Sequence, residues 1–318
     1  MNKYDIIIIG GGPAGLTAAI YAGRRELKTL VLTMDIGGQM NITEHIENYP
    51  GIDLTGGADL GIKMLDQAKK FGAEVAINKE VVGIEKMTGG DYLVKTNDGE
   101  FESQTVILAF GKSPRKLDVD GSDNYIGRGL SYCATCDGPL FRGKKVAVVG
   151  GGNSALGGAL YLSDLAEKVY LVHRRDAFRG DEILLSQIKA KGNIEMVLDS
   201  VISGLEGDGV LEKMKIKNVK SNDESEILVD GIFVEIGYEV KAGFMKDLIK
   251  LDEMNQAIVD MDCRTSEPGI FAAGDITQVP YKQISIAVGQ GSIAALSAYD
   301  YIQKKQGKST VRVDWGTK

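Results

Sequence analysis

Short apolar runs alternate along the chain with segments of helical periodicity. The first run, Ile6 to Ile9, leads into a turn rich in glycine, residues 16–25 then repeat apolar positions at helical spacing, and a second apolar run covers 29–32. Short β-branched runs bounded by polar residues are typical of buried parallel strands. The order strand, glycine turn, helix, strand predicts a βαβ unit.

The middle of the chain repeats this plan. An apolar strand is expected at 145–149, a helix at 156–165 and a further strand at 168–172, with glycines in the first turn. The two glycine turns, starting at Gly10 and Gly150, are 140 residues apart. Two dinucleotide-binding units of the α/β class are therefore predicted in one chain.

The remaining segments are rich in short strands. Residues 74–111 contain Asn97-Asp98-Gly99, a typical hairpin turn. Residues 201–236 form a matching region, with polar turns at 206–209 and 221–223. A long helix is expected from about 285 to 304, followed by a loosely held polar tail from Gln306 that includes residues 311–315.

Composition narrows the class of protein. The chain has 318 residues, which at roughly 100–200 residues per domain suits two domains. Its 37 basic and 44 acidic residues give a net charge of −7, which argues against a nucleic-acid surface or an anionic-membrane anchor. No apolar run reaches the roughly 18–20 residues of a membrane span, and the N-terminus lacks the pattern of a signal peptide. We expect a cytoplasmic protein.

The first glycine turn carries the pattern Gly10-x-Gly12-x-x-Gly15. Glycine is needed there because the turn is tight, the backbone approaches a pyrophosphate, and helix and strand pack closely. The phosphates then meet the free N–H groups of the helix N-terminus. Asp35 is the nearest acidic residue for the ribose, although it lies past the strand in a loop, so its role stays open.

The second turn has the pattern Gly150-x-Gly152-x-x-Ala155, and here the ribose position is basic. Guanidinium groups at that strand end suit the 2′-phosphate of NADP(H), so we expect NADPH rather than NADH. The alternative is a solvated charge cluster without function. The candidate residues for this nucleotide are Gly150, Gly152, Asn153, Ser154, Ala155, His173, Arg174, Arg175 and Arg179.

Two of the three cysteines, Cys133 and Cys136, form a C-x-x-C pair. Such spacing allows a small disulfide ring that exchanges with another disulfide, and Asp137 is within reach to shuttle a proton. Two inert thiols are the alternative. No metal site is expected, because the other candidates for zinc ligands are scattered: Cys263, His45 and His173. Cys263 has no visible partner, and His45 is expected to be an ordinary loop residue.

Other enzyme classes lack their machinery in this chain. There are two histidines, no G-x-S-x-G nucleophile elbow and no G-x-x-x-x-G-K-[ST] phosphate loop. A hydrolase or an ATPase is therefore not expected.

Taken together, these motifs resemble the low-molecular-weight thioredoxin reductases over nearly the full chain. The matching segments are Gly10-Gly-Gly-Pro-Ala-Gly15, Gly37-Gly-Gln39, Glu47-Asn-Tyr-Pro-Gly51, Ser131-Tyr-Cys-Ala-Thr-Cys-Asp-Gly138, His173-Arg-Arg-Asp-Ala-Phe-Arg179 and Gly269-Ile-Phe-Ala-Ala-Gly-Asp275. Their order and spacing are far more specific than any single motif.

The resemblance implies two Rossmann-like domains in three layers, with parallel sheets, added antiparallel β-meanders and one domain inserted in the other. Residues 1–112 plus 246–318 would bind FAD, and residues 113–245 would bind NADPH and carry the dithiol. It also implies a homodimer whose protein substrate is thioredoxin or a thioredoxin- or glutaredoxin-like protein.

The resemblance assigns roles to individual residues. Cys136 would face the flavin, Cys133 would attack the partner disulfide, and Asp137 would be the acid and base. The FAD-binding residues would be Gly10, Gly12, Pro13, Ala14, Gly15, Asp35, Gly37, Gly38, Gln39, Asn48, Gly111, Gly274, Asp275, Lys282, Gln283 and Ile284.

Three segments depart from the family pattern. Leu156-Gly157-Gly158 stands where acidic residues are usual, Ala109-Phe110-Gly111 replaces Ala-Thr-Gly, and a Pro-Asn pair is missing after Ile236-Gly237. The function expected is an NADPH-dependent, FAD-containing thioredoxin-disulfide reductase. The alternatives are the same reductase fed by ferredoxin or a deazaflavin, and a redox sensor without catalytic activity.

Overall fold

The structure is a computed structural model that describes residues 3–42, 46–241 and 243–308. His45 and the tail segment 311–315 lie outside the described residues. The chain divides into two compact units, one made of Met1–Lys112 with Val240–Lys318 and the other of Ser113–Glu239. The second boundary lies earlier than the expected residue 246, because Val240 and Met245 are buried in a core of the first unit.

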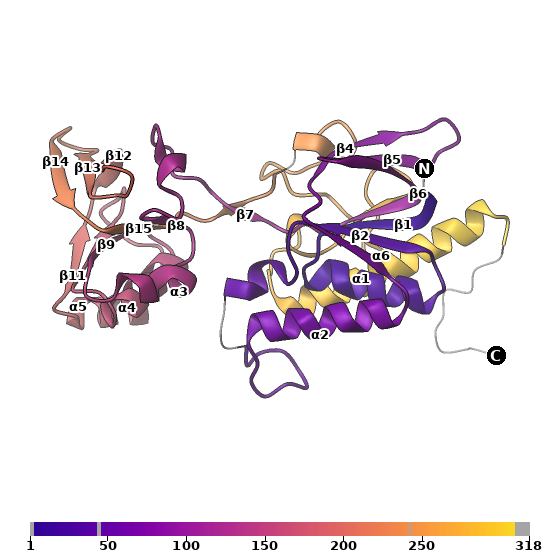
Figure 1. Ribbon diagram of the computed structural model, residues 1–318, viewed down its shortest axis with the longest axis horizontal. Coiled ribbons are helices and arrows are strands. Elements are labelled where there is room, and N and C mark those ends of the chain that lie inside the picture. Colours follow the sequence, from indigo (N-terminus) through magenta and orange to yellow (C-terminus); the bar gives the residue numbers. More distant parts are fainter. Residues whose placement is uncertain (1–2, 43–45, 242, 309–318) are drawn as a thin grey trace. The chain divides into compact units, whose positions relative to one another are not determined.

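The first unit is built on a seven-stranded sheet of order β3-β2-β1-β6-β5-β4, with β17 paired to β6 (Figure 1). The strands are β1 (Lys3–Ile9), β2 (Thr29–Thr33), β3 (Glu74–Ile77), β4 (Val81–Lys86), β5 (Tyr92–Thr96), β6 (Gly99–Leu108) and β17 (Ile270–Ala272). Pairing is parallel from β3 to β6 and to β17, and antiparallel in the β4–β5–β6 meander. The predicted turn at residues 97–98 joins β5 to β6.

Three helices cover one face of this sheet: α1 (Pro13–Arg24), α2 (Gly57–Lys70) and α6 (Ile284–Lys305) (Figure 1). Alanines on the facing sides of α1 and α6 share one hydrophobic core with strands β1 and β6. The helix predicted at 285–304 is thus confirmed as α6. Helix α1 begins three residues earlier than the periodicity predicts, since Pro13 suits the first helical position.

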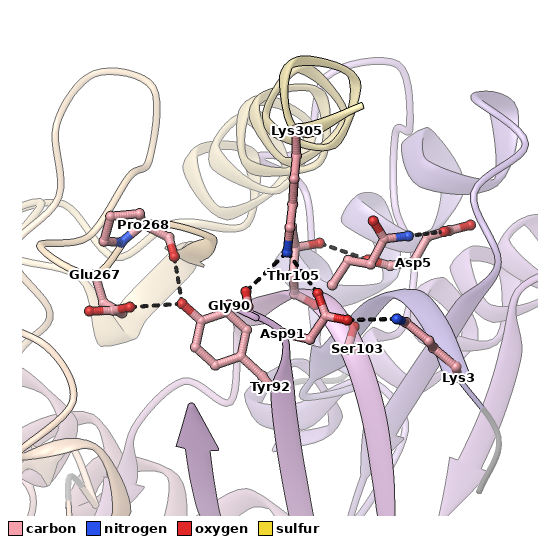
Figure 2. A network of polar contacts seen from close by, with 11 residues as sticks. Lys3, Asp5, Gly90, Asp91, Tyr92, Ser103, Thr105, Glu267, Pro268 and Lys305 are labelled. Carbon is pink, nitrogen blue, oxygen red and sulfur yellow. Dashed lines mark hydrogen bonds and ion pairs between the residues drawn. The ribbon is translucent and has the colours of Figure 1, made fainter. Parts of the chain in front are cut away.

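A polar network joins the β4–β5 turn to distant parts of this unit (Figure 2). Asp91 forms ion pairs with Lys3 at 2.6 Å and with Lys305 of α6 at 2.7 Å. The Tyr92 hydroxyl donates a hydrogen bond to Glu267 at 2.9 Å. The two lysines lower the pKa of Asp91 although burial acts to raise it, and burial raises the pKa of Tyr92. The network therefore ties the chain's first strand and last helix to the meander.

The second unit has a five-stranded parallel sheet of order β11-β10-β9-β15-β8. Its strands are β8 (Leu130–Ser131), β9 (Lys145–Gly150), β10 (Lys168–Val172), β11 (Ile194–Val197) and β15 (Gly231–Glu235). Helices α3 (Ala134–Asp137), α4 (Asn153–Ser163) and α5 (Glu182–Ala190) lie on one face (Figure 1). The other face is covered by an antiparallel sheet of β12 (Ser200–Glu206), β13 (Lys213–Asn218) and β14 (Glu224–Leu228).

A further two-stranded sheet pairs β7 (Ser113–Pro114) with β16 (Tyr238–Glu239). The predicted turns at 206–209 and 221–223 join β12 to β13 and β13 to β14. The expected α/β class, with two Rossmann-like sheets and added antiparallel strands, is confirmed. None of the helices in the described ranges is both long and apolar enough to cross a bilayer.

Candidate active site and nucleotide sites

The first glycine turn, between β1 and α1, has no room for side chains at two of the three glycines of its pattern. Gly10 has φ +115°, and a Cβ there would overlap the carbonyl of Ala109, while a Cβ on Gly15 would overlap the carbonyl of Gly10. At Gly12, in contrast, the nearest atom would be 3.9 Å away. Gly12 is the N-cap of α1 and provides no side-chain cap, so the first N–H groups of the helix face an open cradle.

Helix α6 closes the other side of this turn, since a Cβ on its Gly291 would overlap the carbonyl of Ala14. Ala14 is buried, and a Cβ on Gly274 would lie 2.9 Å from the Ala14 Cβ. The Gly274 N–H donates to Oε1 of Gln290 at 2.9 Å. Gln290 was not singled out from the sequence; the only signal was an amide in the middle of an apolar helix.

The carboxylate of Asp35 binds a backbone N–H of its own loop, which follows β2. Its Oδ1 accepts the N–H of Gly38 at 2.9 Å, which caps a turn where Gly37 and Gly38 both have positive φ. The hydroxyl of Thr33 accepts the N–H of Gly11 at 2.8 Å and so links the loop to the glycine turn. The predicted contact of Asp35 with a ribose stays a prediction, and Thr33 is a linking residue that the motif did not indicate.

Two further contacts bring predicted flavin residues together. Nδ2 of Asn48 donates to Oε1 of Gln283 at 3.2 Å across 235 positions of sequence. Nε2 of Gln39 donates to the carbonyl of Lys112 at 3.0 Å, next to Gly111 with φ +68°. The loop after β2, the end of β6 and the start of α6 are therefore neighbours in space.

Asp275, in the short turn that follows β17, is a partly buried carboxyl with no hydrogen-bond partner among the described residues. Burial raises its pKa, while Lys282 and Lys112 act in the opposite direction. Lys282 donates to the carbonyl of Thr277 at 2.6 Å, and α6 begins beside it at Ile284. A carboxyl of this kind can accept a ligand hydroxyl, so the turn and this acidic group fit a dinucleotide with a hydroxylated chain, such as FAD.

The second glycine turn, between β9 and α4, leaves the same open space at the start of its helix. A Cβ on Gly150 would overlap the carbonyl of Glu235, whereas Gly152 has no atom within 4 Å of its Cβ position. Gly152 is the N-cap of α4 and lacks a side-chain cap. Ala155 is fully buried and Ser154 is exposed at the start of the helix. This turn therefore also fits a pyrophosphate.

The loop that carries the arginines is attached to this turn at two points. The Arg179 N–H donates to the carbonyl of Gly151 at 2.8 Å. The Asn153 amide donates to Oδ2 of Asp181 at 3.0 Å and accepts the Asp181 N–H at 2.7 Å. The polar atoms of the Asn153 side chain are thus engaged within the protein.

His173 lies beneath the turn rather than on the surface. It is 5% exposed, stacks on Phe178 with ring centroids 5.0 Å apart, and its Nε2 lies 3.2 Å from the carbonyl oxygen of Ala177. A Cβ on Gly151 would overlap its ring. Burial lowers the pKa of His173; the hydrogen bond with Ala177 acts in the opposite direction, and the adjacent arginines lower the pKa further.

Arg174, Arg175 and Arg179 are exposed and make no ion pair among the described residues. The acidic neighbour in the same loop, Asp176, is bound by Lys220 at 3.0 Å, which lowers the pKa of Asp176 and compensates its charge. The loop therefore offers three guanidinium groups to an anion.

Cys133 and Cys136 form a disulfide across α3. Cys133 is the N-cap of this helix, and its Sγ accepts the Cys136 N–H at 3.1 Å, a contact that would stabilise a thiolate at Cys133. Ser131 donates to Oδ2 of Asp137 at 2.7 Å and accepts the Cys133 N–H at 3.0 Å. Ser131 thus connects the cysteine to the acidic residue, a role that sequence reasoning missed.

The third cysteine belongs to the other compact unit and is buried there. Cys263 is 2% exposed, and burial raises the pKa of its thiol to about 12. Within the described ranges, no three His, Cys, Asp or Glu side chains gather as metal ligands would.

Comparisons with known proteins agree with this geometry. Residues 4–291 match the pyridine nucleotide-disulphide oxidoreductase family. The chain is 40% identical to a thioredoxin reductase of Bacillus subtilis over 308 residues, 95% of this chain and 96% of that protein. It is 38% identical to one of Helicobacter pylori over 311 residues, 94% and 99% of the two chains. The crystal structure of the Lactococcus lactis thioredoxin reductase matches with a TM-score of 0.84 and 42% identity, covering 95% of this chain and 99% of that one.

The expected fold, enzyme class and cofactors, FAD and NADPH, are confirmed at the level of the family. An enzyme of this class needs two nucleotide sites and a redox-active disulfide, and both nucleotide turns and the Cys133–Cys136 pair are present. The chain belongs to the pyridine nucleotide-disulphide oxidoreductase family.

Proposed function

We propose that the chain is a thioredoxin-disulfide reductase, which uses NADPH and FAD to reduce the disulfide of a thioredoxin- or glutaredoxin-like protein. The observation that carries this proposal is the Cys133–Cys136 disulfide, held in the same unit as a nucleotide turn with three available arginines. FAD and NADPH, when bound, supply the two-electron chemistry that converts this disulfide to a dithiol.

In this proposal the first unit holds FAD. The free N–H groups at the start of α1 would bind the pyrophosphate, since Gly12 leaves that helix end uncapped. Asp275 would accept hydroxyls of the cofactor chain, and Lys282 and Lys112 would add positive charge nearby. The contact between Asn48 and Gln283 would keep the two walls of the site together.

The second unit would hold NADPH at the uncapped start of α4. Arg174, Arg175 and Arg179 would bind the 2′-phosphate, because guanidinium groups pair with phosphate through two hydrogen bonds. His173, whose ring is buried against Gly151, would support the turn from below instead of binding the phosphate itself.

The dithiol would act by thiol–disulfide exchange. The Cys133 thiolate, favoured by the Cys136 N–H, attacks one sulfur of the partner disulfide and releases the other as a thiolate. Asp137, held by Ser131, would take up the proton that the Cys133 thiol loses and pass it to this leaving thiolate. Cys136 then attacks the mixed disulfide, which re-forms the Cys133–Cys136 bond and releases the second thiol of the partner.

The oligomeric state, the compartment and the partners of the enzyme are also part of this proposal. We infer that it works as a homodimer in the cytoplasm, where a reducing environment suits a dithiol that cycles. Its net charge of −7 argues against nucleic acid or an anionic membrane as a partner. The relatives named thioredoxin reductase favour a thioredoxin as the protein substrate.

An anaerobic titration tests this function. Stoichiometric NADPH should bleach the flavin spectrum quickly, equimolar NADH should do so much more slowly, and a disulfide-bonded thioredoxin should then be reduced. Cys136→Ser should keep the flavin but abolish thioredoxin reduction. If dithionite or reduced ferredoxin bleaches the flavin and NADPH does not, the donor assignment fails. If NADPH bleaches it and no thioredoxin is reduced, the substrate assignment fails.

A further inference from the structure

Three elements of the second unit meet beneath the dithiol: α3, α4 and the end of β15. Glu235 is the last residue of β15 and pairs with Gly150 in the nucleotide turn. A Cβ on Gly158 of α4 would lie 3.3 Å from the Ala134 Cβ and 3.9 Å from Cγ of Glu235. Ala134 stands between the two cysteines in sequence. The side chain of Glu235 therefore lies next to the helix that carries the disulfide.

This contact gives a reason for one of the two unusual glycines. Gly158 leaves room for Ala134 and Glu235, whereas a Cβ on Gly157 would meet no atom within 4 Å. Residue 158 lies in the segment where the family pattern has acidic residues, and in this chain a carboxyl from the neighbouring strand, that of Glu235, lies beside it.

The carboxyl of Glu235 has no compensating cation among the described residues. Burial raises its pKa to about 6, and the backbone N–H of Ala134 partly offsets this by favouring the ionised form. The titratable groups on the elements around it are few. Helix α3 contributes Asp137, which is bonded to Ser131, and β16 contributes Tyr238, whose pKa is raised by burial and then by Glu235. Neither α4 nor β8 has a charged residue.

We propose that Glu235 is a positioning residue for the Cys133–Cys136 dithiol: its carboxylate holds the first turn of α3 through Ala134 and, by its charge, limits how readily the two thiols of this helix ionise. The inference rests on the proposed function only in taking this pair as the redox group. A negative charge near a thiol disfavours the thiolate. The charge state of Glu235 would therefore change the fraction of the attacking cysteine that is present as thiolate.

The test follows the thiols directly and needs neither NADPH nor thioredoxin. The holoenzyme is reduced with dithiothreitol, freed of excess reagent and treated with iodoacetamide between pH 5 and pH 9. Mass spectrometry of the peptide with Cys133 and Cys136 gives the alkylation rates, so buried Cys263 does not contribute. Glu235→Gln removes the charge at constant size, Glu235→Asp keeps it, and Glu239→Gln removes an exposed carboxyl four positions further along the chain, in β16.

The cysteines of Glu235→Gln should be alkylated about three- to tenfold faster than those of the wild type at pH 7, since a tenfold change corresponds to one unit in the thiol pKa. We expect the wild type to show an inflection near pH 6, where Glu235 would titrate, and this inflection should be lost in Glu235→Gln and kept in Glu235→Asp and Glu239→Gln. Glu235→Gln should also melt at a higher temperature at pH 8, because it removes a buried charge.

Equal rates and profiles for Glu235→Gln and the wild type would overturn the inference. So would a lower melting temperature of Glu235→Gln with an unchanged pH profile, which would indicate a purely structural residue. These outcomes are separate from the proposed function: an altered alkylation profile in a protein that does not reduce thioredoxin would keep the role of Glu235 and refute the substrate.

Discussion

Asn153 and Asp181 hold each other by two hydrogen bonds, 3.0 Å from the amide to the carboxylate and 2.7 Å from the backbone N–H to the amide oxygen. Asn153 is the first residue of α4, directly after the glycine turn, and Asp181 is the N-cap of α5. The segment that carries Arg174, Arg175 and Arg179 is therefore fastened to the turn that would bind the pyrophosphate.

This fastening predicts a selective effect on NADPH. In Asn153→Ala the arginine loop is held less firmly, so the KM for NADPH should rise roughly tenfold, equivalent to about 1.4 kcal/mol. The KM for NADH should change little, because NADH has no 2′-phosphate. Steady-state kinetics with both nucleotides give the comparison, and Ser186→Ala on the exposed part of α5 is the control. Equal increases in KM for both nucleotides would show that the Asn153–Asp181 pair only supports the fold.

The arginines themselves should decide the choice of nucleotide. Replacing Arg174 and Arg175 together by alanine removes charge-assisted hydrogen bonds, each worth about 1.5–3 kcal/mol. We expect kcat/KM for NADPH to fall at least a hundredfold and that for NADH to stay within a few fold. Lys189→Ala, an exposed cation on α5, should leave both values unchanged. If the double variant still prefers NADPH, another residue binds the 2′-phosphate and determines the preference.

Adjacent glycines of the second turn should respond differently to alanine. A Cβ at Gly151 would overlap the His173 ring, so Gly151→Ala should lose about 1–3 kcal/mol of the free energy of unfolding. A Cβ at Gly152 meets no protein atom within 4 Å, so Gly152→Ala should fold normally and yet weaken nucleotide binding. Urea unfolding and NADPH titration of both variants separate the two effects. Normal binding by Gly152→Ala would remove this turn from the nucleotide site.

The network at Asp91 predicts how stability depends on pH. Lys3 and Lys305 lower the pKa of Asp91 in the folded state, so its ionised form stabilises the fold above the unfolded pKa of roughly 3.9. This contribution is lost as the pH falls through the lower, folded-state pKa. Asp91→Asn should therefore lower the melting temperature at pH 7, and the difference from the wild type should disappear in acid. Asp66→Asn on exposed α2 should show no such convergence, and a constant difference for Asp91→Asn would contradict the ion-pair explanation.

Local patterns were enough to predict both βαβ units, the hairpin turn at 97–98, helix α6 and the redox pair. Each depends on neighbouring residues: the glycines permit a tight turn next to a strand, and the C-x-x-C spacing brings two sulfurs together within one helical turn. For the same reason the arginine cluster could be recognised, since it directly follows a strand of the second unit.

Contacts between distant segments were decided only by the tertiary structure. Asn48 meets Gln283 across 235 residues, and His173 is buried under a turn instead of standing with the arginines. Glu235 becomes a neighbour of the helix that carries the dithiol because β15 ends beside β9 and Gly158 leaves space on α4. Periodicity and spacing describe which face a residue occupies, but the partner on that face, and with it burial and charge state, is determined by how the sheet and helices pack.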